Sequence, residues 1–339
     1  MSDLKSLDLL QLKALCQKLG WETYRPQQIF NWIWQKGITD INLMTNLSKS
    51  KRAQLQKGYF ISALFLIERK VASDGSQKFL FELSDKTRIE SVFIPEVNRK
   101  TVCVSTQVGC PLRCRFCYTG QIGFIRNLKF FEIADQVLQI QLLTKTRITN
   151  VVFMGMGEPL LNYQETLKAI ETINSDYGLN IGARKITVST AGIPPQIYQF
   201  ADFPLQTKLA ISLNAATDEL RNKLMPINQK YPLSELLKSV KYYTAKKRKR
   251  VTFEYVLIKN INDRDADAKA LIKLLANIPS KINLIPLNPY PGCQFQSPTI
   301  AEIEEFAKKL YPHLPAVSIR KSRGSEILAG CGQLTAKNN

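Results

Sequence analysis

Three closely spaced cysteines, Cys110, Cys114 and Cys117, are the residues with the clearest capacity for chemistry in the 339-residue sequence. Thiolates at this spacing on one loop can together bind a soft metal centre. A 4Fe-4S cluster held by three cysteines keeps one iron free for an external ligand. A structural zinc ion would need a fourth ligand, and no nearby Cys or His supplies one. The spacing therefore favours a 4Fe-4S cluster, with a zinc site as the alternative.

A short glycine-containing segment, 154–159, is the second feature that could bind a ligand. Its small residues would let a ligand approach the backbone, and the Glu158 carboxylate could accept hydrogen bonds from an ammonium group. The segment lacks the third glycine of a dinucleotide-binding motif, and a plain turn is the alternative. Small polar residues recur at later strand ends, where helix capping is the alternative to ligand binding. The candidate cofactor-binding residues are Gly157, Glu158, Ser189, Ser212, Leu213, Asn214 and Asn288.

Two further cysteines and one carboxylate stand apart from these motifs. Cys103 lies in a predicted strand ahead of the cysteine triplet, and Cys331 lies between two glycines near the C-terminus. Glu90 lies on a predicted hairpin strand that leads into the core. By spacing alone, the thiols are typical of core cysteines and the carboxylate is typical of a surface residue.

The elements that must position these residues alternate between strands and helices from residue 101 onward. Strands are predicted at 101–107, 150–154, 184–189, 208–213, 251–258 and 281–287, with a weaker one at 316–320, and helices at 131–145, 163–175, 233–247 and 264–277. This alternation predicts an α/β fold with a parallel sheet, open or curled into a partial barrel. Ligands bind at the C-terminal ends of such strands, and the candidate residues follow those ends.

The first hundred residues have a different pattern. Residues 1–65 are predicted to form a small, basic, helical domain, because apolar residues recur with helical spacing before Gly20. Residues 66–100 are predicted to form a β-hairpin that carries Glu90 and is closed by Pro95. The remaining boundaries place the barrel at 101–325 and a tail with Cys331 at 326–339.

Composition and charge limit the class of protein. The formal net charge of +19 favours a polyanionic partner, and nucleic acid fits better than a membrane because no amphipathic anchor is visible. The only histidine, His313, excludes His-ligated zinc sites and His-based triads. No apolar run is long enough to span a membrane. The odd number of seven clustered cysteines argues against a secreted disulfide framework, so we expect a cytoplasmic protein without a membrane partner.

Together, these motifs resemble those of the RlmN/Cfr family of radical S-adenosylmethionine RNA adenine methyltransferases. The resemblance implies a partial (β/α)6 radical-SAM barrel and a 4Fe-4S cluster bound by the three clustered cysteines. It also implies two molecules of S-adenosylmethionine per turnover, in contact with the candidate cofactor-binding residues. It spans essentially the whole chain and is carried by Arg25–Gln28, Cys110–Cys117, Gly155–Pro159, Val188–Gly192, Asn283–Pro289 and Cys331–Leu334.

The substrate class is likewise implied by the resemblance. The dominant branch of the family methylates C2 of an adenosine in 23S ribosomal RNA. Some members of this branch also methylate the adenosine next to the tRNA anticodon. The smaller branch methylates C8, which is the alternative here; C2 is preferred because its branch is the common one. The resemblance further implies an external electron donor, and we expect a monomer.

Three residues take chemical roles by resemblance. The cysteine matching Cys331 first accepts a methyl group on its sulfur, and that carbon later joins the adenine ring. The glutamate matching Glu90 removes the ring proton. The cysteine matching Cys103 then releases the product by forming a disulfide with Cys331. The chain departs from the family at Asn214, where the family commonly has His, and this alters the expected contact with the cofactor.

A rival from another class is a non-catalytic RNA-binding protein with a structural metal site. It predicts bound zinc and no requirement for Cys103 or Cys331. The basic run Lys246–Arg250 suits phosphate contacts under either hypothesis, with a solvated helix end as its alternative.

Overall fold

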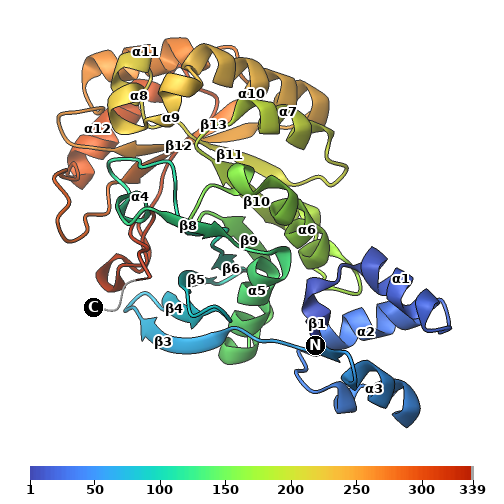
Figure 1. Cartoon of the computed structure of the whole chain (residues 1–339). Helices are drawn as coiled ribbons and strands as arrows, with labels where there is room; N and C mark the ends of the chain where they lie inside the picture. The colour runs from blue at the N-terminus through green and yellow to red at the C-terminus, as the bar shows by residue number, and fades with distance from the viewer. Residues whose placement is uncertain (337–339) are drawn as a thin grey trace.

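A ten-stranded sheet extends through most of the computed structural model, which describes residues 1–336 (Figure 1). Its strand order is β14-β13-β12-β11-β10-β9-β6-β5-β4-β3, and the strands from β6 to β14 are parallel. These strands form the partial barrel that the sequence predicts. They are β6 (Arg99–Cys103), β9 (Asn150–Phe153), β10 (Ile186–Thr190), β11 (Lys208–Ser212), β12 (Val251–Leu257), β13 (Ser280–Pro286) and β14 (Val317–Ile319).

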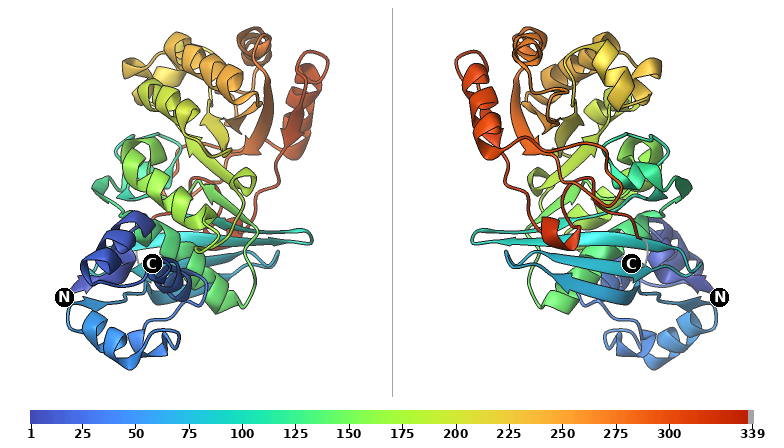
Figure 2. Two further views of the ribbon diagram at one scale, coloured as in Figure 1. Left: turned by 90° about the vertical axis from the view of Figure 1, so that its right-hand side faces the viewer. Right: turned by 90° about the vertical axis from the view of Figure 1, so that its left-hand side faces the viewer.

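Helices cover the outer face of the parallel strands (Figures 1 and 2). Four of them, α7, α8, α9 and α12, are absent from the sequence-based expectation. Helix α7 begins with two prolines, which usually indicate a helix break but are tolerated in the first turn of a helix. Helix α12 begins with a capping box formed by Thr299 and Glu302. In residues 1–336 no helix is long and apolar enough to cross a membrane. The covering helices are α5 (Phe130–Thr144), α6 (Tyr163–Asn174), α7 (Pro194–Asp202), α8 (Asp218–Leu224), α9 (Ile227–Lys230), α10 (Leu233–Lys247), α11 (Asp265–Leu275) and α12 (Ile300–Leu310).

Side chains alternate between two faces along each parallel strand. On the helix-covered face, Val188, Ile211 and Phe253 are fully buried and belong to the main hydrophobic core. On the opposite, inner face, Ser189 and Ser212 are partly exposed. The inner face is therefore the side of the sheet on which polar side chains are available for chemistry.

Three antiparallel strands continue the sheet beyond β6, namely β5 (Arg88–Glu96), β4 (Gln77–Glu82) and β3 (Phe65–Val71). The predicted hairpin corresponds to β4 and β5, but β5 also pairs with β6, so the extension is continuous with the barrel. Pro95 does not close the hairpin, because β5 continues to Glu96 and pairs Pro95 with Lys100. A proline is tolerated in a strand where its missing N–H is not needed for the ladder.

The predicted strand at 101–107 is two strands. After β6 ends, the side-chain amide of Gln136 binds both backbone groups of Ser105, accepting from its N–H at 2.8 Å and donating to its carbonyl at 2.9 Å. These contacts replace those of a neighbouring strand. The chain then turns into β7 (Gln107–Gly109), which pairs with β8 (Phe124–Asn127).

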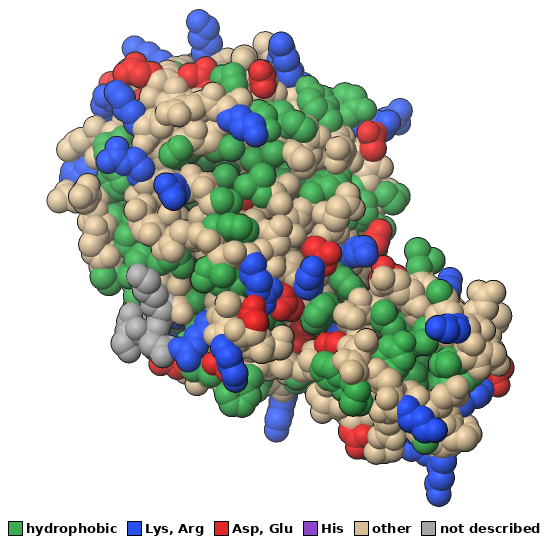
Figure 3. Space-filling model, viewed as in Figure 1, with side chains coloured by type: hydrophobic (Ala, Val, Ile, Leu, Met, Phe, Trp, Pro, Cys, Tyr) green, Lys and Arg blue, Asp and Glu red, His purple; other side chains and the backbone are tan. Residues whose placement is uncertain are grey.

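The N-terminal segment forms a smaller lobe beside the barrel (Figure 3). A buried ion pair of 2.6 Å between Lys5 and Asp135 of α5 fastens this lobe to the barrel, and both side chains are at most 3% exposed. The domain boundaries at residues 65, 100 and 325 stay predictions. The elements of the lobe are β1 (Ser2–Asp3), α1 (Leu9–Lys18), α2 (Arg25–Trp34), α3 (Lys49–Gln56) and β2 (Tyr59–Phe60).

Candidate active site

The three clustered cysteines lie on the loop between β7 and the short helix α4 (Tyr118–Gln121). The Cys117 N–H donates to the Cys114 carbonyl at 3.1 Å, and the Cys110 N–H donates to the Gly123 carbonyl at 2.7 Å. All three side chains pack against one small apolar cluster. The loop therefore brings the three thiols together at the C-terminal end of the first parallel strand.

Burial controls the protonation of these thiols. It raises the pKa of Cys110 to about 12 and also raises the pKa values of Cys114 and Cys117. At neutral pH the thiols would stay protonated unless a metal centre binds them. Within residues 1–336, no three Cys, His, Asp or Glu side chains surround a single-ion position. In a 4Fe-4S cluster each thiolate binds a different iron, and three cysteines on one loop are the donor set of such a cluster.

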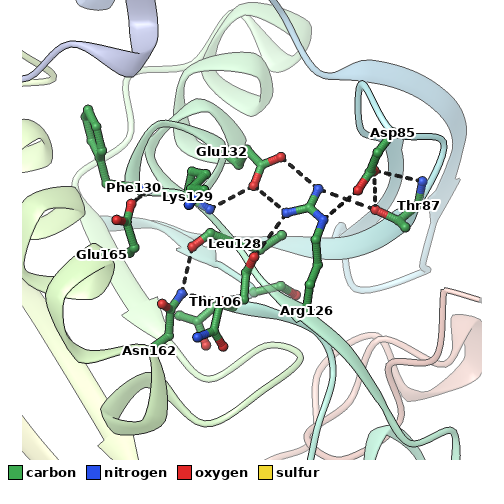
Figure 4. A network of polar contacts seen from close by, with 12 residues as sticks. Asp85, Thr87, Thr106, Arg126, Leu128, Lys129, Phe130, Glu132, Asn162 and Glu165 are labelled. Atoms are coloured by element: carbon green, nitrogen blue, oxygen red, sulfur yellow. Dashed lines mark hydrogen bonds and ion pairs between the residues drawn. The ribbon is translucent and has the colours of Figure 1, made fainter.

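Arg126 on β8 ties the strand after the cysteine loop to two other parts of the fold (Figure 4). Its Nε donates to Asp85, in the turn between β4 and β5, at 2.6 Å, and its terminal nitrogens donate to Glu132 of α5 at 2.8 and 2.9 Å. The hydrogen bond from Arg126 lowers the pKa of Asp85 to about 2. The cysteine loop is thus held against the antiparallel extension that carries Glu90.

Two backbone N–H groups hold the Glu158 carboxylate in the segment after β9. The Leu160 N–H donates to one oxygen at 3.0 Å and the Ala191 N–H to the other at 2.7 Å. Gly157 has a φ of +99°, and a Cβ there would lie 2.6 Å from the Cβ of Gln107, so only glycine fits. Burial raises the pKa of Glu158 to about 7, although the hydrogen bonds oppose this shift. Each oxygen keeps a lone pair that could accept from an ammonium group.

The ends of β10 and β11 carry further candidate cofactor residues. Ser189 and Ser212 are partly exposed on the inner face. Asn214 differs, because its side chain is buried and already bonded. Its Oδ1 accepts from the Val256 N–H at 2.9 Å, and its Nδ2 donates to the Met225 sulfur at 3.3 Å. In this structure the Asn214 amide supports its neighbours.

Arg221 is a site residue that the sequence analysis misses. Its fully buried guanidinium donates to the carbonyls of Ala191 at 2.5 Å, Ser212 at 3.2 Å and the buried Leu213 at 3.0 Å. Burial lowers its pKa to about 10, so it remains charged at neutral pH, and this charge acts on Cys114. One cation therefore joins the ends of β10 and β11 beside the cysteine loop. In the sequence it is one basic residue among 47, and nothing marks it as buried.

The C-terminal tail is fastened across this end of the barrel (Figure 1). The Tyr118 N–H donates to the Gly332 carbonyl at 2.7 Å, and the Asn288 side chain donates to the Cys331 carbonyl at 3.2 Å. Gly330 passes so close to Asn288 that a Cβ there would lie 2.8 Å from the Asn288 Cγ. Asn288 thus contacts the tail in this structure.

Cys331 and Cys103 share this part of the site. Cys103 ends β6 and is 9% exposed, whereas the Cys331 side chain is exposed. The surrounding protein nevertheless desolvates both thiols and raises the pKa of each to about 12, and charges on Cys117 and Cys103 raise the pKa of Cys331 further. The two cysteines therefore lie within electrostatic reach of each other. All seven cysteines are free, so the implied Cys103–Cys331 disulfide is not present here and stays a proposal for one reaction step.

Glu90 is buried on β5, which corrects its interpretation as a surface carboxylate. Its side chain is 4% exposed and forms an ion pair of 2.9 Å with Lys78, a second residue that the sequence analysis misses. The Thr335 N–H of the tail donates to its other oxygen at 2.7 Å. Glu90 and Cys331 therefore belong to one connected region.

The basic run Lys246–Arg250 is only partly free to contact phosphates. Lys246 pairs with Asp202 at 3.0 Å, and Lys247 is buried and donates to the carbonyls of Phe203 and Leu205. Arg248 and Arg250 remain exposed. Lys249 donates to the Gln206 carbonyl at 2.9 Å, so three of the five side chains are bonded within the protein.

Comparison with known families agrees with this arrangement. Residues 104–272 match the radical SAM superfamily, and residues 2–61 match the ribosomal RNA large subunit methyltransferase N-terminal domain. The partial barrel and its cysteine loop define a radical SAM enzyme.

Similarity to individual proteins extends over nearly the whole chain. The sequence is 44% identical to the dual-specificity RNA methyltransferase RlmN of Geobacter sulfurreducens, over 99% of this chain and 93% of that one. It is 45% identical to the protein of the same name from Syntrophus aciditrophicus, over 99% and 97%. The crystal structure of a radical SAM methyltransferase from Sphaerobacter thermophilus matches with a TM-score of 0.93 and 40% identity, covering 99% of this chain and 100% of that one. The chain belongs to the RlmN family.

The protein is therefore an RNA adenine methyltransferase that uses a 4Fe-4S cluster and S-adenosylmethionine. This excludes the alternative of a non-catalytic RNA-binding protein with a zinc site.

Proposed function

We propose that the protein methylates C2 of an adenosine in 23S ribosomal RNA and the adenosine next to the anticodon of tRNA, in the cytoplasm. The printed name of the relatives, dual-specificity RNA methyltransferase, supports two RNA substrates. The match of residues 2–61 to a ribosomal RNA large subunit methyltransferase domain supports ribosomal RNA as one of them. Methylation at C8 is the alternative product.

The proposed ligands of the cluster are Cys110, Cys114 and Cys117, because their thiols converge on one loop. The cluster and S-adenosylmethionine, when bound, supply the methyl group and the radical chemistry that a side-chain base could not provide. Glu158 would accept from the ammonium group of the cofactor, at a position where only Gly157 leaves room. Residues at the strand ends would either contact the cofactor themselves or hold the residues that contact it. These residues are Ser189, Ser212, Leu213, Asn214 and Asn288.

The observation that carries the proposal is the placement of Cys331 in a tail fastened to Tyr118 and Asn288 beside the cysteine loop, where the charge of Cys103 also acts on its thiol. Cys331 would accept a methyl group on its sulfur, and the methyl carbon would then be joined to the adenine ring. Glu90 would take the ring proton. The Cys103 thiolate would next attack the Cys331 sulfur, so that an S–S bond forms and the S–C bond breaks. The electron pair of the S–C bond would go to the carbon, which takes up the proton held by Glu90 and stays on the RNA as the methyl group. An external electron donor would return the disulfide to two thiols before the next turnover.

The position of the product methyl group tests this proposal. RNA treated with the reconstituted enzyme would be digested to nucleosides and analysed by mass spectrometry against C2- and C8-methyladenosine standards. We expect C2-methyladenosine from both a 23S ribosomal RNA fragment and tRNA, and none from Cys331→Ala. A C8 product would contradict the proposed regiochemistry, and an unmodified tRNA would remove the second substrate.

A further inference from the structure

Basic side chains surround the end of the barrel that lies opposite the cysteine loop. Each lies within one residue of the first residue of a parallel strand, whereas the cysteine loop follows a strand's C-terminal end. This set is termed the basic rim and consists of Arg99, Lys185, Lys208, Arg250 and Lys281.

Strand register places three members of the basic rim on the inner face of the sheet. Cys103 pairs with Val152, Val152 with Thr187, and Thr187 with Lys208, so Lys208 lies on the same face as Cys103. Lys185 ends the 3-10 helix Ala183–Lys185 that leads into β10, so strand alternation does not place its side chain, but its charge acts on Lys208.

The same register continues around the barrel. Ala210, two residues after the first residue of β11, pairs with Thr252, and Thr252 pairs with Lys281. Arg99 lies four residues before Cys103 within β6 and shares its face, whereas Arg250 lies one residue before β12 begins. Arg99, Lys208 and Lys281 therefore lie on the face that carries Cys103, and Lys185 and Arg250 lie at the same end of the barrel, one residue before their strands.

The charges of the basic rim act on one another across the barrel. Burial lowers the pKa of Lys208, and the charges of Arg99, Lys281 and Lys185 lower it further. Burial and a set of charges that includes Arg99 and Arg250 lower the pKa of Lys281, although Glu254 opposes them. The strands β6 and β13 are not neighbours in the sheet, so the effect of Arg99 on Lys281 reaches across the inner face.

Acidic residues do not neutralise the rim. Within residues 1–336, none of its members other than Arg99 forms an ion pair, and Arg99 reaches Glu96 only at 3.9 Å. A ring of five cations, four of them without an ion pair to the described residues, is a binding surface for a polyanion.

The opposite end of the barrel is covered by the tail. The Thr119 hydroxyl donates to the Leu334 carbonyl at 2.6 Å, and the Gln333 side chain donates to the Pro289 carbonyl at 2.7 Å. A base arriving from that end would have to displace the segment that carries Cys331.

The inner face offers a polar path from the basic rim to the thiols. Thr187, Thr252 and Glu254 are partly exposed along it, and Glu254 accepts from the Asn283 side chain at 2.9 Å. The charge of Glu254 also acts on Cys331, so this thiol lies within reach of the path.

We propose that the basic rim binds the RNA phosphates that flank the target adenosine, and that the base enters the barrel through the rim to reach Cys331. This inference rests on the proposed function. RNA fits better than an acidic electron-transfer protein, because such a protein would have to approach the cysteine loop at the other end of the barrel. Phosphate contacts from Lys and Arg fix position without reading sequence, so one rim can serve two different RNAs.

The test compares two quadruple variants of the full-length enzyme. In the rim variant, Lys185→Gln, Lys208→Gln, Arg250→Gln and Lys281→Gln are combined. The matched control replaces four exposed lysines on the outer helices α10 and α11 by glutamine. These are Lys238, Lys241, Lys269 and Lys273. Binding to a 23S ribosomal RNA fragment is measured over a range of salt concentrations, and the methyl content of Cys331 is measured by peptide mass spectrometry.

In a plot of the logarithm of the RNA-binding constant against the logarithm of the salt concentration, the slope of the rim variant should be smaller in magnitude by about 3. Each lost phosphate contact with single-stranded RNA accounts for about 0.7. The KM of the rim variant for RNA should rise about tenfold or more. The control should keep the wild-type slope, and Cys331 should be methylated in both variants because that step needs no RNA. A rim variant with wild-type RNA affinity and slope would overturn the inference.

Two further outcomes are separable. Wild-type RNA affinity, with turnover lost only when a protein reductant replaces dithionite, would assign the rim to an electron donor and overturn the RNA inference. Unmethylated Cys331 in the wild-type enzyme would instead count against the proposed function. If the quadruple variant does not fold, the single variants Lys208→Gln and Lys185→Gln should each lower the slope by about 0.7, and an unchanged slope in both would overturn the inference.

Discussion

Lys78 joins Glu90 to the C-terminal tail. Its Nζ lies 2.9 Å from one Glu90 oxygen and donates to the Leu328 carbonyl at 3.3 Å, while the Thr335 N–H donates to the other Glu90 oxygen at 2.7 Å. The pair thus holds the tail on both sides of Cys331. A carboxylate proposed to remove a ring proton is also an anchor for the segment that carries Cys331.

Glu90→Gln should separate these two roles. The amide oxygen of glutamine can still accept from the Thr335 N–H, but glutamine cannot take a proton at neutral pH. We expect Cys331 to remain methylated while RNA methylation falls about 10²- to 10⁴-fold, the usual contribution of a general base. Peptide mass spectrometry and product analysis measure the two steps separately. Loss of Cys331 methylation would show that Glu90 acts mainly as an anchor, and full RNA methylation would exclude it as the base.

Lys78→Met should destabilise the protein. It leaves the Glu90 carboxylate buried without its cation, a change that costs about 3–5 kcal/mol in comparable buried pairs. Lys78→Arg keeps the charge and serves as the matched control. Thermal melting under anaerobic conditions gives the comparison, with a clear loss for Met and a smaller one for Arg. A Met variant that melts like the wild type would mean that the pair contributes nothing to the folded state.

Glu158 should make cofactor binding dependent on pH. Burial raises its pKa to about 7, and only the ionised carboxylate pairs well with an ammonium group. The ionised fraction falls as pH drops, so affinity for S-adenosylmethionine should fall about fivefold from pH 7 to pH 6 and about tenfold for each further unit. Above pH 8 it should be nearly constant. Equilibrium dialysis provides the affinities, and Glu158→Gln should bind weakly with no such dependence. A wild-type affinity that is flat between pH 6 and pH 8 would contradict this role.

The sequence predicts the barrel well because its elements carry local signals. Apolar strands and amphipathic helices alternate with clear periods, so α6 and α10 are located almost to the residue. The cysteine loop and the segment around Glu158 are visible for the same reason, since their residues are close together in the chain.

Residues that act through distant contacts are not visible in this way. Lys78 donates a hydrogen bond to a carbonyl 250 residues away, and Arg221 donates hydrogen bonds to carbonyls at two separate strand ends. The basic rim likewise appears only after the strands are paired, because its members are scattered from residue 99 to residue 281. The spacing of residues along the chain does not indicate contacts between residues that are far apart in the sequence.

The role of Cys103 is the point on which the proposed reaction depends most. The carbon that joins Cys331 to the adenine would form a thioether, which is stable in water, and a second thiol must break it. Cys16 is buried in the N-terminal lobe, and Cys293 packs against the apolar cluster near the cysteine loop. Because the charge of Cys103 acts on Cys331, Cys103 is the thiol that we propose for this step.

The most direct measurement is denaturing gel electrophoresis of Cys103→Ala after reaction with a labelled ribosomal RNA fragment. We expect a covalent protein–RNA adduct that migrates above the free protein, disappears on nuclease digestion and is absent from the Cys103→Ala, Cys331→Ala double variant. A Cys103→Ala enzyme that turns over at the wild-type rate without forming any adduct would contradict this expectation.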